Sequence, residues 1–315
     1  MKYCQLLVLL TFLLVGSGIE VQSQNSELDI TYQQNSDNSV DFNFEKQLYG
    51  TFLVNVRFEQ LSNCDQRSAS TYNYKGTISG DSGKVLSLEP KNPDQGIGFS
   101  FSYIYHRGKP RPRIKENFEY ILPFKRGTKV KVSRVSNLNL YLGKGVSDTW
   151  KAFQFSTEKE AVVVAARRGL VVEVVDEYQA DTTRAYSYVR SVNKVLIEHR
   201  DGTLAEYSGF KAGSINVKEG QIVQPYTELG MAGRYNSDND KVLRFHVYYL
   251  NTRDLFRASM NKENTNMYAF VNPLFCYKGG RANLLANNFY VADCTNELIQ
   301  QEFTRREKKK FVSPL

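Results

Sequence analysis

The feature that most constrains the fold of this chain is a repeated alternation of apolar and polar residues in short runs. Residues 52–58 follow this pattern, with phenylalanine or valine at every second position, and residues 99–105 repeat it with aromatic side chains. Because successive side chains of a β-strand point to opposite faces, a period of two is typical of strands with one buried face. The alternating aromatic side chains are therefore assigned to packing in a core.

Strand candidates of this kind fill the chain and predict an all-β, mainly antiparallel fold. The first half favours a β-sandwich over residues 40–140. It is preceded by a loose entry segment at 24–39, which is rich in Asn, Gln, Ser and Asp. A second domain is expected over residues 141–275, with a hairpin turn at Asp201-Gly202. The expected strands lie at 52–58, 85–88, 99–105, 130–135, 162–164, 170–175, 194–198, 204–207, 221–223 and 242–250.

The first residues indicate export. Lys2 is followed by an apolar run at residues 6–16 and then by small and polar residues through Ser23, a pattern typical of a secretory signal peptide over residues 1–23. The apolar run is about half the length of a membrane-spanning helix. The mature protein is therefore expected in the periplasm, in the cell envelope or outside the cell, and peripheral at most to a membrane.

The formal net charge is +8, with one dense basic run at residues 305–310. This run is interpreted as a solvated tail. It belongs to a C-terminal extension expected over residues 276–315, in which a short helix is expected near 297–303. Attraction to a polyanionic envelope surface is the functional alternative. Nucleic acid is not expected as a partner, because the chain is exported and has no groove-reading motif.

Three cysteines follow the expected signal peptide. Export permits disulfides, and the spacing of Cys276 and Cys294 suits a bridge within one small C-terminal substructure. Cys64 is then left unpaired. None of the three has CxxC spacing, so a zinc knuckle is not supported.

Four motifs in the second half follow one another in a consistent order. They are AARRGLVVEV at 165–174, VLIEHRDGT at 195–203, VKEGQIV at 217–223 followed by LG at 229–230, and LRFHV at 243–247. Together they resemble the LytM/lysostaphin family of zinc peptidoglycan endopeptidases, which have the duplicated-hybrid-motif fold. The resemblance covers residues 150–250 and implies a LytM-like β-sheet domain. The preceding sandwich resembles the N-terminal β domains of Bacteroidetes-type envelope proteins with such peptidases.

The resemblance also implies where zinc ligands would lie, and each of these positions holds another residue. Trp150 and Gln154 replace the His and Asp of the family's HxxxD motif, counting back eleven residues from Ala165. Arg244 replaces the second His of its HxH motif. Indole has no lone pair for a metal, an amide is a weaker ligand than carboxylate, and a guanidinium repels a divalent cation. The chain has three histidines, so no shift of the alignment restores either motif.

The family's catalytic positions are substituted as well. Gly209 replaces the His of a Tyr-x-His-Leu motif that begins at Tyr207, and Val242 replaces the first His of HxH. Neither side chain can transfer a proton. His246 is expected on the strand face of Val242 and Arg244, either as a surviving proton donor or as a partly buried structural histidine. His199 is expected to be structural.

These substitutions favour a catalytically inactive LytM-like domain that acts as a binding or regulatory module, without a metal or cofactor. Its partner would be peptidoglycan or an envelope protein. Arg244 would bind a carboxylate or be held by an internal acidic residue. One alternative is a divergent zinc endopeptidase that cleaves peptidoglycan cross-links, and another is an accessory surface or secretion-machinery protein in which the sandwich binds. The expected cleft consists of Trp150, Gln154, Tyr207, Arg244 and His246.

Overall fold

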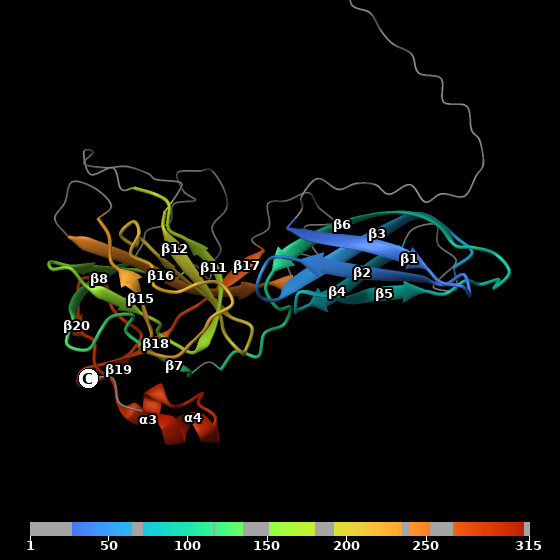
Figure 1. The fold of residues 1–315 in the computed structure, drawn as a ribbon. Coiled ribbons are helices and arrows are strands. Elements are labelled where there is room, and N and C mark those ends of the chain that lie inside the picture. Colours follow the sequence, from blue (N-terminus) through green and yellow to red (C-terminus); the bar gives the residue numbers. More distant parts are fainter. Residues whose placement is uncertain are drawn as a thin grey trace, which may run out of the picture.

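The computed structural model describes residues 27–64, 72–115, 117–134, 151–179, 192–234, 240–252 and 267–311. Within these ranges the chain is mostly antiparallel β-sheet, as predicted, with two short helices near the C-terminus (Figure 1). The expected signal segment 1–23 and Trp150 lie outside the described residues. No helix in the described part is long and apolar enough to cross a membrane.

The N-terminal domain is a sandwich of two three-stranded sheets. Alternating apolar residues of both sheets meet between them, and Phe42, Phe52 and Phe58 are almost completely buried there. The aromatic residues of residues 99–105 pack against this core, as predicted. One sheet has the order β1 (Leu28–Gln34), β2 (Val40–Lys46) and β5 (Ser82–Leu88), and the other has the order β4 (Tyr72–Ile78), β3 (Phe52–Ser62) and β6 (Gly98–Arg107).

The prediction of a loose entry segment at 24–39 is wrong for residues 28–34, which form a strand. Strand β1 begins at Leu28 and pairs with β2 along its whole length. Leu28 and Ile30 are the buried residues of this strand. Two apolar residues among many polar ones are too few to indicate a strand by their alternation.

The second domain is built on a nine-stranded sheet. Its core contains Phe153, Phe155, Tyr207, Phe245 and Phe275. The strand order is β14 (Ile222–Val223), β11 (Gly169–Val175), β12 (Lys194–Glu198), β13 (Leu204–Ser208), β16 (Lys241–Leu250), β9 (Ala152–Thr157), β8 (Lys129–Arg134) and β20 (Phe289–Val291), with β17 (Tyr268–Val271) also on β16. Smaller sheets pair β10 (Val162–Val164) with β15 (Glu228–Met231), and β18 (Leu274–Tyr277) with β19 (Gly280–Ala282) and β7 (Glu119–Ile121).

Two expected domain boundaries need correction. Strand β8 was assigned to the sandwich, but it pairs with β9 and β20 in the large sheet. Residues 276–291 were assigned to an extension, but β18 to β20 pair with strands of the second domain. Alternation shows which face of a strand is buried, but it does not show which sheet the strand joins.

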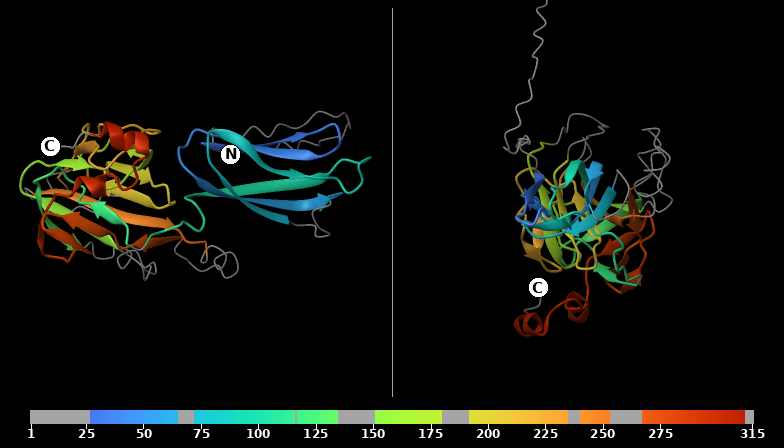
Figure 2. Two further views of the ribbon diagram at one scale, coloured as in Figure 1. Left: turned by 90° about the horizontal axis from the view of Figure 1, so that it is seen from below. Right: turned by 90° about the vertical axis from the view of Figure 1, so that its right-hand side faces the viewer.

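The basic C-terminal run is solvated, as expected, since all its Lys and Arg side chains are exposed, but it is a helix and not an irregular tail. After the expected helix, observed as α3 (Asn296–Ile299), the run forms α4 (Arg305–Lys310) on the second domain (Figure 2). Thr304 and Glu307 form a reciprocal capping box at its start. Glu307 also accepts a hydrogen bond from Arg168 at 2.7 Å, and this contact holds the helix against the domain.

Cys276 and Cys294 are both buried and lie beside each other, but no disulfide joins them in the structure. A hydrogen bond between the two thiols lowers the pKa of Cys276 and raises that of Cys294. Cys64 is buried in the sandwich and is also a free thiol. The disulfide therefore stays a prediction, now with its two partners in contact.

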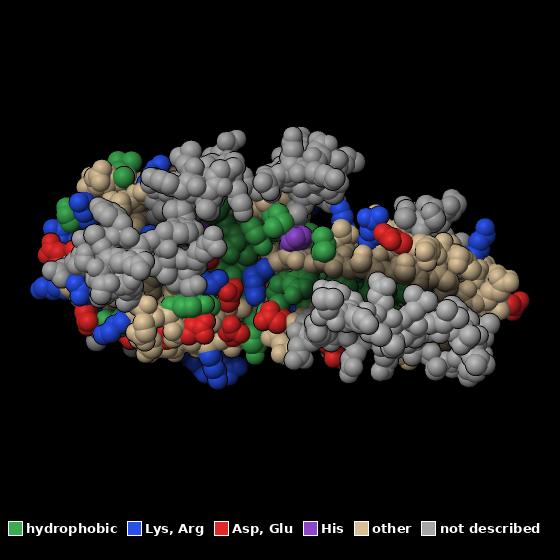
Figure 3. Space-filling model, turned by 90° about the horizontal axis from the view of Figure 1, so that it is seen from above, with side chains coloured by type: hydrophobic (Ala, Val, Ile, Leu, Met, Phe, Trp, Pro, Cys, Tyr) green, Lys and Arg blue, Asp and Glu red, His purple; other side chains and the backbone are tan. Residues whose placement is uncertain are grey.

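The two domains are arranged end to end (Figures 1 and 2), and hydrophobic side chains gather where they meet (Figure 3). Both the backbone N–H and the hydroxyl of Thr51 donate to the carboxylate of Glu198, at 2.7 and 2.6 Å. The hydroxyl of Tyr268 donates to the carbonyl of Arg107 at 3.0 Å. These bonds tie the sandwich directly to strands of the second domain.

Candidate functional site

The positions that the sequence assigned to zinc ligands meet on one face of the large sheet. Strand β16 lies between β9 and β13, and Arg244 is directly opposite Gln154 on one side and Ser208 on the other. Direct cross-strand partners have their Cβ atoms about 4.5–5.5 Å apart. The structure therefore brings together two of the three expected ligand positions, while Trp150 lies outside the described residues.

The alternation of β16 decides which side chains share this face. Leu243, Phe245 and Val247 are fully buried in the core of the domain, so the residues between them point to the other face. That face carries Val242, Arg244 and His246, as predicted, and all three are partly buried. An arginine in this row places a permanent positive charge at the centre of the candidate site.

Tyr207 does not belong to the site. It pairs with Phe245, is completely buried, and its ring packs on Phe245 with centroids 4.9 Å apart. Its hydroxyl accepts a hydrogen bond from the backbone N–H of Ala166 at 2.8 Å. The prediction that Tyr207 lines the cleft is wrong, because the following residue, Ser208, is the one on the face of Arg244.

His246 lies one step further along the same face. It is opposite Glu206 on β13, and its ring lies 5.3 Å from that of Tyr248 and 5.7 Å from that of Phe270. Burial lowers the pKa of His246, although the negative charge of Glu206 acts in the opposite direction. A neutral histidine packed among aromatic rings fits the structural interpretation better than that of a proton donor.

Gly209 and Val242 lie near the end of this face that is close to Ser208. Gly209 has a φ of +102°, and its carbonyl accepts a hydrogen bond from Gly233 at 2.7 Å. A Cβ atom on Gly233 would approach that carbonyl oxygen to 2.9 Å, so this close contact of two backbones requires a glycine. Val242 forms an isolated β-bridge with Gly233. The two substituted catalytic positions, Gly209 and Val242, are therefore both held by backbone contacts with Gly233.

The donor set of this face does not fit zinc. A catalytic zinc ion takes three His, Asp, Glu or Cys ligands around an open position. Gln154 and Ser208 are neutral, and Arg244 lies between them. Among the described residues no group of three or more His, Cys, Asp or Glu side chains could hold a metal ion.

A second polar cluster, around Arg167, was not singled out in the sequence. Arg167 is 3% exposed and donates to Asp201 at 2.7 Å, to both carboxylate oxygens of Glu302 at 2.7 and 3.0 Å, and to the hydroxyl of Tyr120 at 3.1 Å. These bonds outweigh burial and raise its pKa. The sequence signal was the pair of arginines among the small and apolar residues at 165–172.

His199 adjoins this cluster and is structural, in agreement with the expectation for it. It is 2% exposed, and its Nδ1 is 2.7 Å from the carbonyl oxygen of Arg168. Burial, and then the positive charge of Arg167, lower the pKa of His199 to about 3. The ring is therefore neutral and donates from Nδ1 to the carbonyl.

No model of a known protein family matches the chain. No curated protein matches it either.

Similar solved structures include the SpoIIQ–SpoIIIAH pore-forming complex, with 15% identity, a TM-score of 0.27, and 42% of this chain and 85% of that chain covered. A zinc-containing peptidase from Vibrio cholerae has 15% identity, a TM-score of 0.27, and coverage of 70% and 74%. Csd3 from Helicobacter pylori has 11% identity, a TM-score of 0.29, and coverage of 90% and 76%. These values do not place the chain in a family.

Proposed function

We propose that this chain is an exported envelope protein whose LytM-like second domain binds peptidoglycan or an envelope protein without cleaving it. The observation that carries the proposal is the direct pairing of Gln154 with Arg244. Both residues occupy positions that would hold one zinc ion in the family that the sequence resembles. Two ligands of one ion must lie within a few ångströms of it, so their pairing supports the alignment.

The chemistry of the paired residues supports binding over hydrolysis. Gln154 offers an uncharged amide and Arg244 a cation, where a hydrolytic zinc site needs anionic or imidazole ligands. The planar fork of a guanidinium suits a carboxylate, which it can bind through two parallel hydrogen bonds. Peptidoglycan stem peptides and acidic protein segments both supply carboxylates, and this is the ligand group proposed for Arg244.

Binding to purified peptidoglycan tests the proposal. The mature protein is expected to sediment with insoluble peptidoglycan, and Arg244→Ala is expected to weaken retention about tenfold, the effect of losing roughly 1.4 kcal/mol. Arg57→Ala is the matched control, because Arg57 is an exposed arginine of the sandwich paired only with the nearby Glu59 among described residues. Equal retention of wild type and Arg244→Ala would remove the site from the proposal.

Metal analysis separates this function from the zinc endopeptidase alternative. The purified protein is expected to contain no stoichiometric zinc and to release no soluble fragments from peptidoglycan. The triple substitution Trp150→His, Gln154→Asp, Arg244→His is expected to introduce zinc binding, since it restores the family's ligand set. Chelatable zinc in the wild type, together with released fragments, would establish the enzyme instead.

A further inference from the structure

Helix α4 is the densest run of positive charge in the chain, and it protrudes from the second domain. Five of its six residues are basic, and all five side chains are exposed. These residues are Arg305, Arg306, Lys308, Lys309 and Lys310. Figures 1 and 2 show α3 and α4 at the outer edge of the second domain, beyond its sheets. A flat surface can therefore approach the helix without meeting the rest of the domain first.

The basic side chains cover the side of α4 that faces away from the domain. Glu307 marks the opposite side, where its carboxylate accepts hydrogen bonds from Arg168 at 2.7 Å and from Gln224 at 3.1 Å. In a helix of 3.6 residues per turn, the five basic positions spread over an arc centred opposite to Glu307. The helix therefore presents one continuous basic face to solvent.

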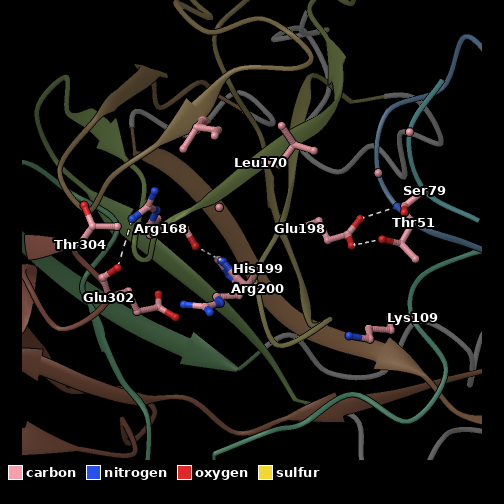
Figure 4. Close-up of a pocket in the computed structure, with 14 residues that line it drawn as sticks. Thr51, Ser79, Lys109, Arg168, Leu170, Glu198, His199, Arg200, Glu302 and Thr304 are labelled. Carbon is pink, nitrogen blue, oxygen red and sulfur yellow. Dashed lines mark hydrogen bonds between the residues drawn. The ribbon is translucent and has the colours of Figure 1, made fainter. Parts of the chain in front are cut away.

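The neighbouring carboxylates do not balance this charge. Among the described residues, none of the five basic side chains of α4 forms an ion pair, while Glu302 binds Arg167 and Glu307 binds Arg168. Arg168 also donates to the backbone carbonyl of Glu302 at 3.1 Å (Figure 4). The five basic residues and these two arginines together face four carboxylates, those of Asp201, Glu297, Glu302 and Glu307. An excess of three positive charges remains.

The arrangement of these charges opposes folding of the helix. Arg305 and Arg306 occupy its first turn, where the helix dipole favours negative charge. Each also lies four residues before another cation, Lys309 or Lys310, and like charges at this spacing destabilise a helix. Nothing in the described part of the chain relieves this repulsion, whereas an anionic partner on the basic face would relieve it.

An apolar cavity of about 510 Å³ adjoins the basic face. Tyr226, Phe303 and Phe311 line it with aromatic rings, and the rings of Phe303 and Phe311 lie 5.6 Å apart. Arg306 and Lys310 of the basic face line the same cavity. Cations beside an apolar cavity suit a ligand that carries both an anionic group and hydrocarbon.

We propose that α4 and this cavity form a docking surface for a membrane of anionic phospholipids. The five cations bind headgroup phosphates, and the aromatic cavity receives the apolar part of a lipid. A bilayer is favoured over other polyanionic surfaces because it offers hydrocarbon next to phosphate. None of these residues belongs to the β16 face, so the proposal is independent of the function proposed for that face.

Sedimentation with lipid vesicles at low ionic strength tests the surface. The mature protein is expected to bind vesicles of equal parts phosphatidylglycerol and phosphatidylcholine, and not vesicles of phosphatidylcholine alone. Each basic residue at an anionic bilayer increases the affinity by about fivefold. Replacing all five by Gln is therefore expected to lower the affinity at least tenfold, and Gln preserves the helix propensity. Added sodium chloride is expected to weaken wild-type binding, because it screens the charges.

Soluble polyphosphate, which offers phosphates without hydrocarbon, is the second arm of the test. Phe311→Ala is expected to weaken binding to the anionic vesicles several-fold and to leave binding to polyphosphate unchanged. Equal binding of this variant and the wild type to the vesicles would overturn the role of the cavity. Binding to polyphosphate without binding to anionic vesicles would assign the basic face to another polyanion and overturn the proposal.

The matched control removes the same net charge from exposed lysines outside α4 and its cavity. These are replaced by Gln at Lys91, Lys131, Lys159, Lys218 and Lys278. This control and Arg244→Ala are both expected to bind the anionic vesicles nearly as the wild type does, and both fivefold variants are expected to unfold near the wild-type temperature. Equal losses of affinity in the two fivefold variants would overturn the proposal, as would absence of wild-type binding to the anionic vesicles.

Discussion

Arg167 connects three parts of the second domain through one guanidinium group. It binds the hairpin at Asp201, the C-terminal segment at Glu302 and strand β7 at Tyr120, and it lies 3.6 Å above the ring of Phe118. Replacing Arg167 by Met leaves two largely buried carboxylates without a counter-charge. We expect a loss of about 3–5 kcal/mol in the free energy of unfolding, measured by urea denaturation.

Arg167→Lys is the control for charge without the planar fork. It is expected to lie between the wild type and Arg167→Met, since an ammonium cannot bond both oxygens of Glu302 and Asp201 in the same geometry. A loss below about 1 kcal/mol for Arg167→Met, within the range of exposed ion pairs, would contradict the role assigned to this cluster.

Because the pKa of His199 is lowered in the folded protein, the protein is expected to lose stability on acidification. The pKa of this histidine is about 3 in the folded protein, whereas an unfolded histidine titrates near its ordinary value of about 6.5. Between these values the unfolded chain binds more protons, so stability falls as the pH falls, by up to about 1.4 kcal/mol per pH unit for this group. The free energy of unfolding, measured from pH 6.5 to 4.5, is expected to show this slope.

His199→Asn is expected to reduce that slope, because an amide can donate to the carbonyl of Arg168 and does not titrate. His106 and His246 also have a lowered pKa from burial and remain in the variant. Only the difference between variant and wild type therefore belongs to His199. Identical slopes in both proteins would show that His199 is not protonated on unfolding.

The sequence correctly predicted the face of the sheet on which Arg244 lies, but it did not predict the face on which Tyr207 lies. Val242, Arg244 and His246 were placed correctly because all three lie in one strand, where alternation is unambiguous. Tyr207 was placed by its position in the Tyr-x-His-Leu motif of the family that the sequence resembles. The side of the sheet it faces depends on the register between β13 and β16, and a shift of one residue reverses it.

At the scale of elements, the sequence predicted half of the described strands and few of their partners. The ten strands expected from the sequence are all observed, including β16 and the hairpin of β12 and β13. Ten further strands of the described residues were missed. In β7 and β20 only three residues are available to show a period of two, but β2 and β9 were missed although they have seven and six residues. The pairing of β7 with β18 joins segments far apart in the sequence, and no local pattern encodes it.

The contact between Cys276 on β18 and Cys294 after β20 predicts a disulfide in the oxidised protein. Both thiols are buried, and Cys276 has the lowered pKa that favours its thiolate as the attacking group. The intact mass under non-reducing conditions is expected to be about 2 Da below that of the reduced protein, since disulfide formation removes two hydrogens. For a loop of this approximate length the bridge stabilises by about 3 kcal/mol.

Cys64→Ser is expected to keep this mass difference, because Cys64 lies in the core of the other domain. Cys276→Ser is expected to lose both the mass difference and the added stability. A wild-type mass equal to that of the reduced chain after air oxidation would contradict the bridge.

At the scale of the whole molecule, the arrangement of the domains depends on a close backbone approach at Gly50. This residue has a φ of +93°, and a Cβ atom there would lie 2.6 Å from Glu198 and 2.8 Å from Val172 of the second domain. Gly50→Ala is therefore expected to open the junction, to speed trypsin cleavage in the linker at residues 108–115, whose Lys and Arg side chains are already exposed, and to increase the radius of gyration in small-angle scattering. Gly127→Ala separates this effect from backbone strain, because Gly127 has a φ of +83° with nothing within 4 Å of the added Cβ. Both substitutions carry the strain of a left-handed conformation, roughly 1–2 kcal/mol, but only Gly50→Ala meets the other domain. Equal trypsin sensitivity and equal radii of gyration for the two variants would mean that the contact of Thr51 with Glu198 does not hold the domains together.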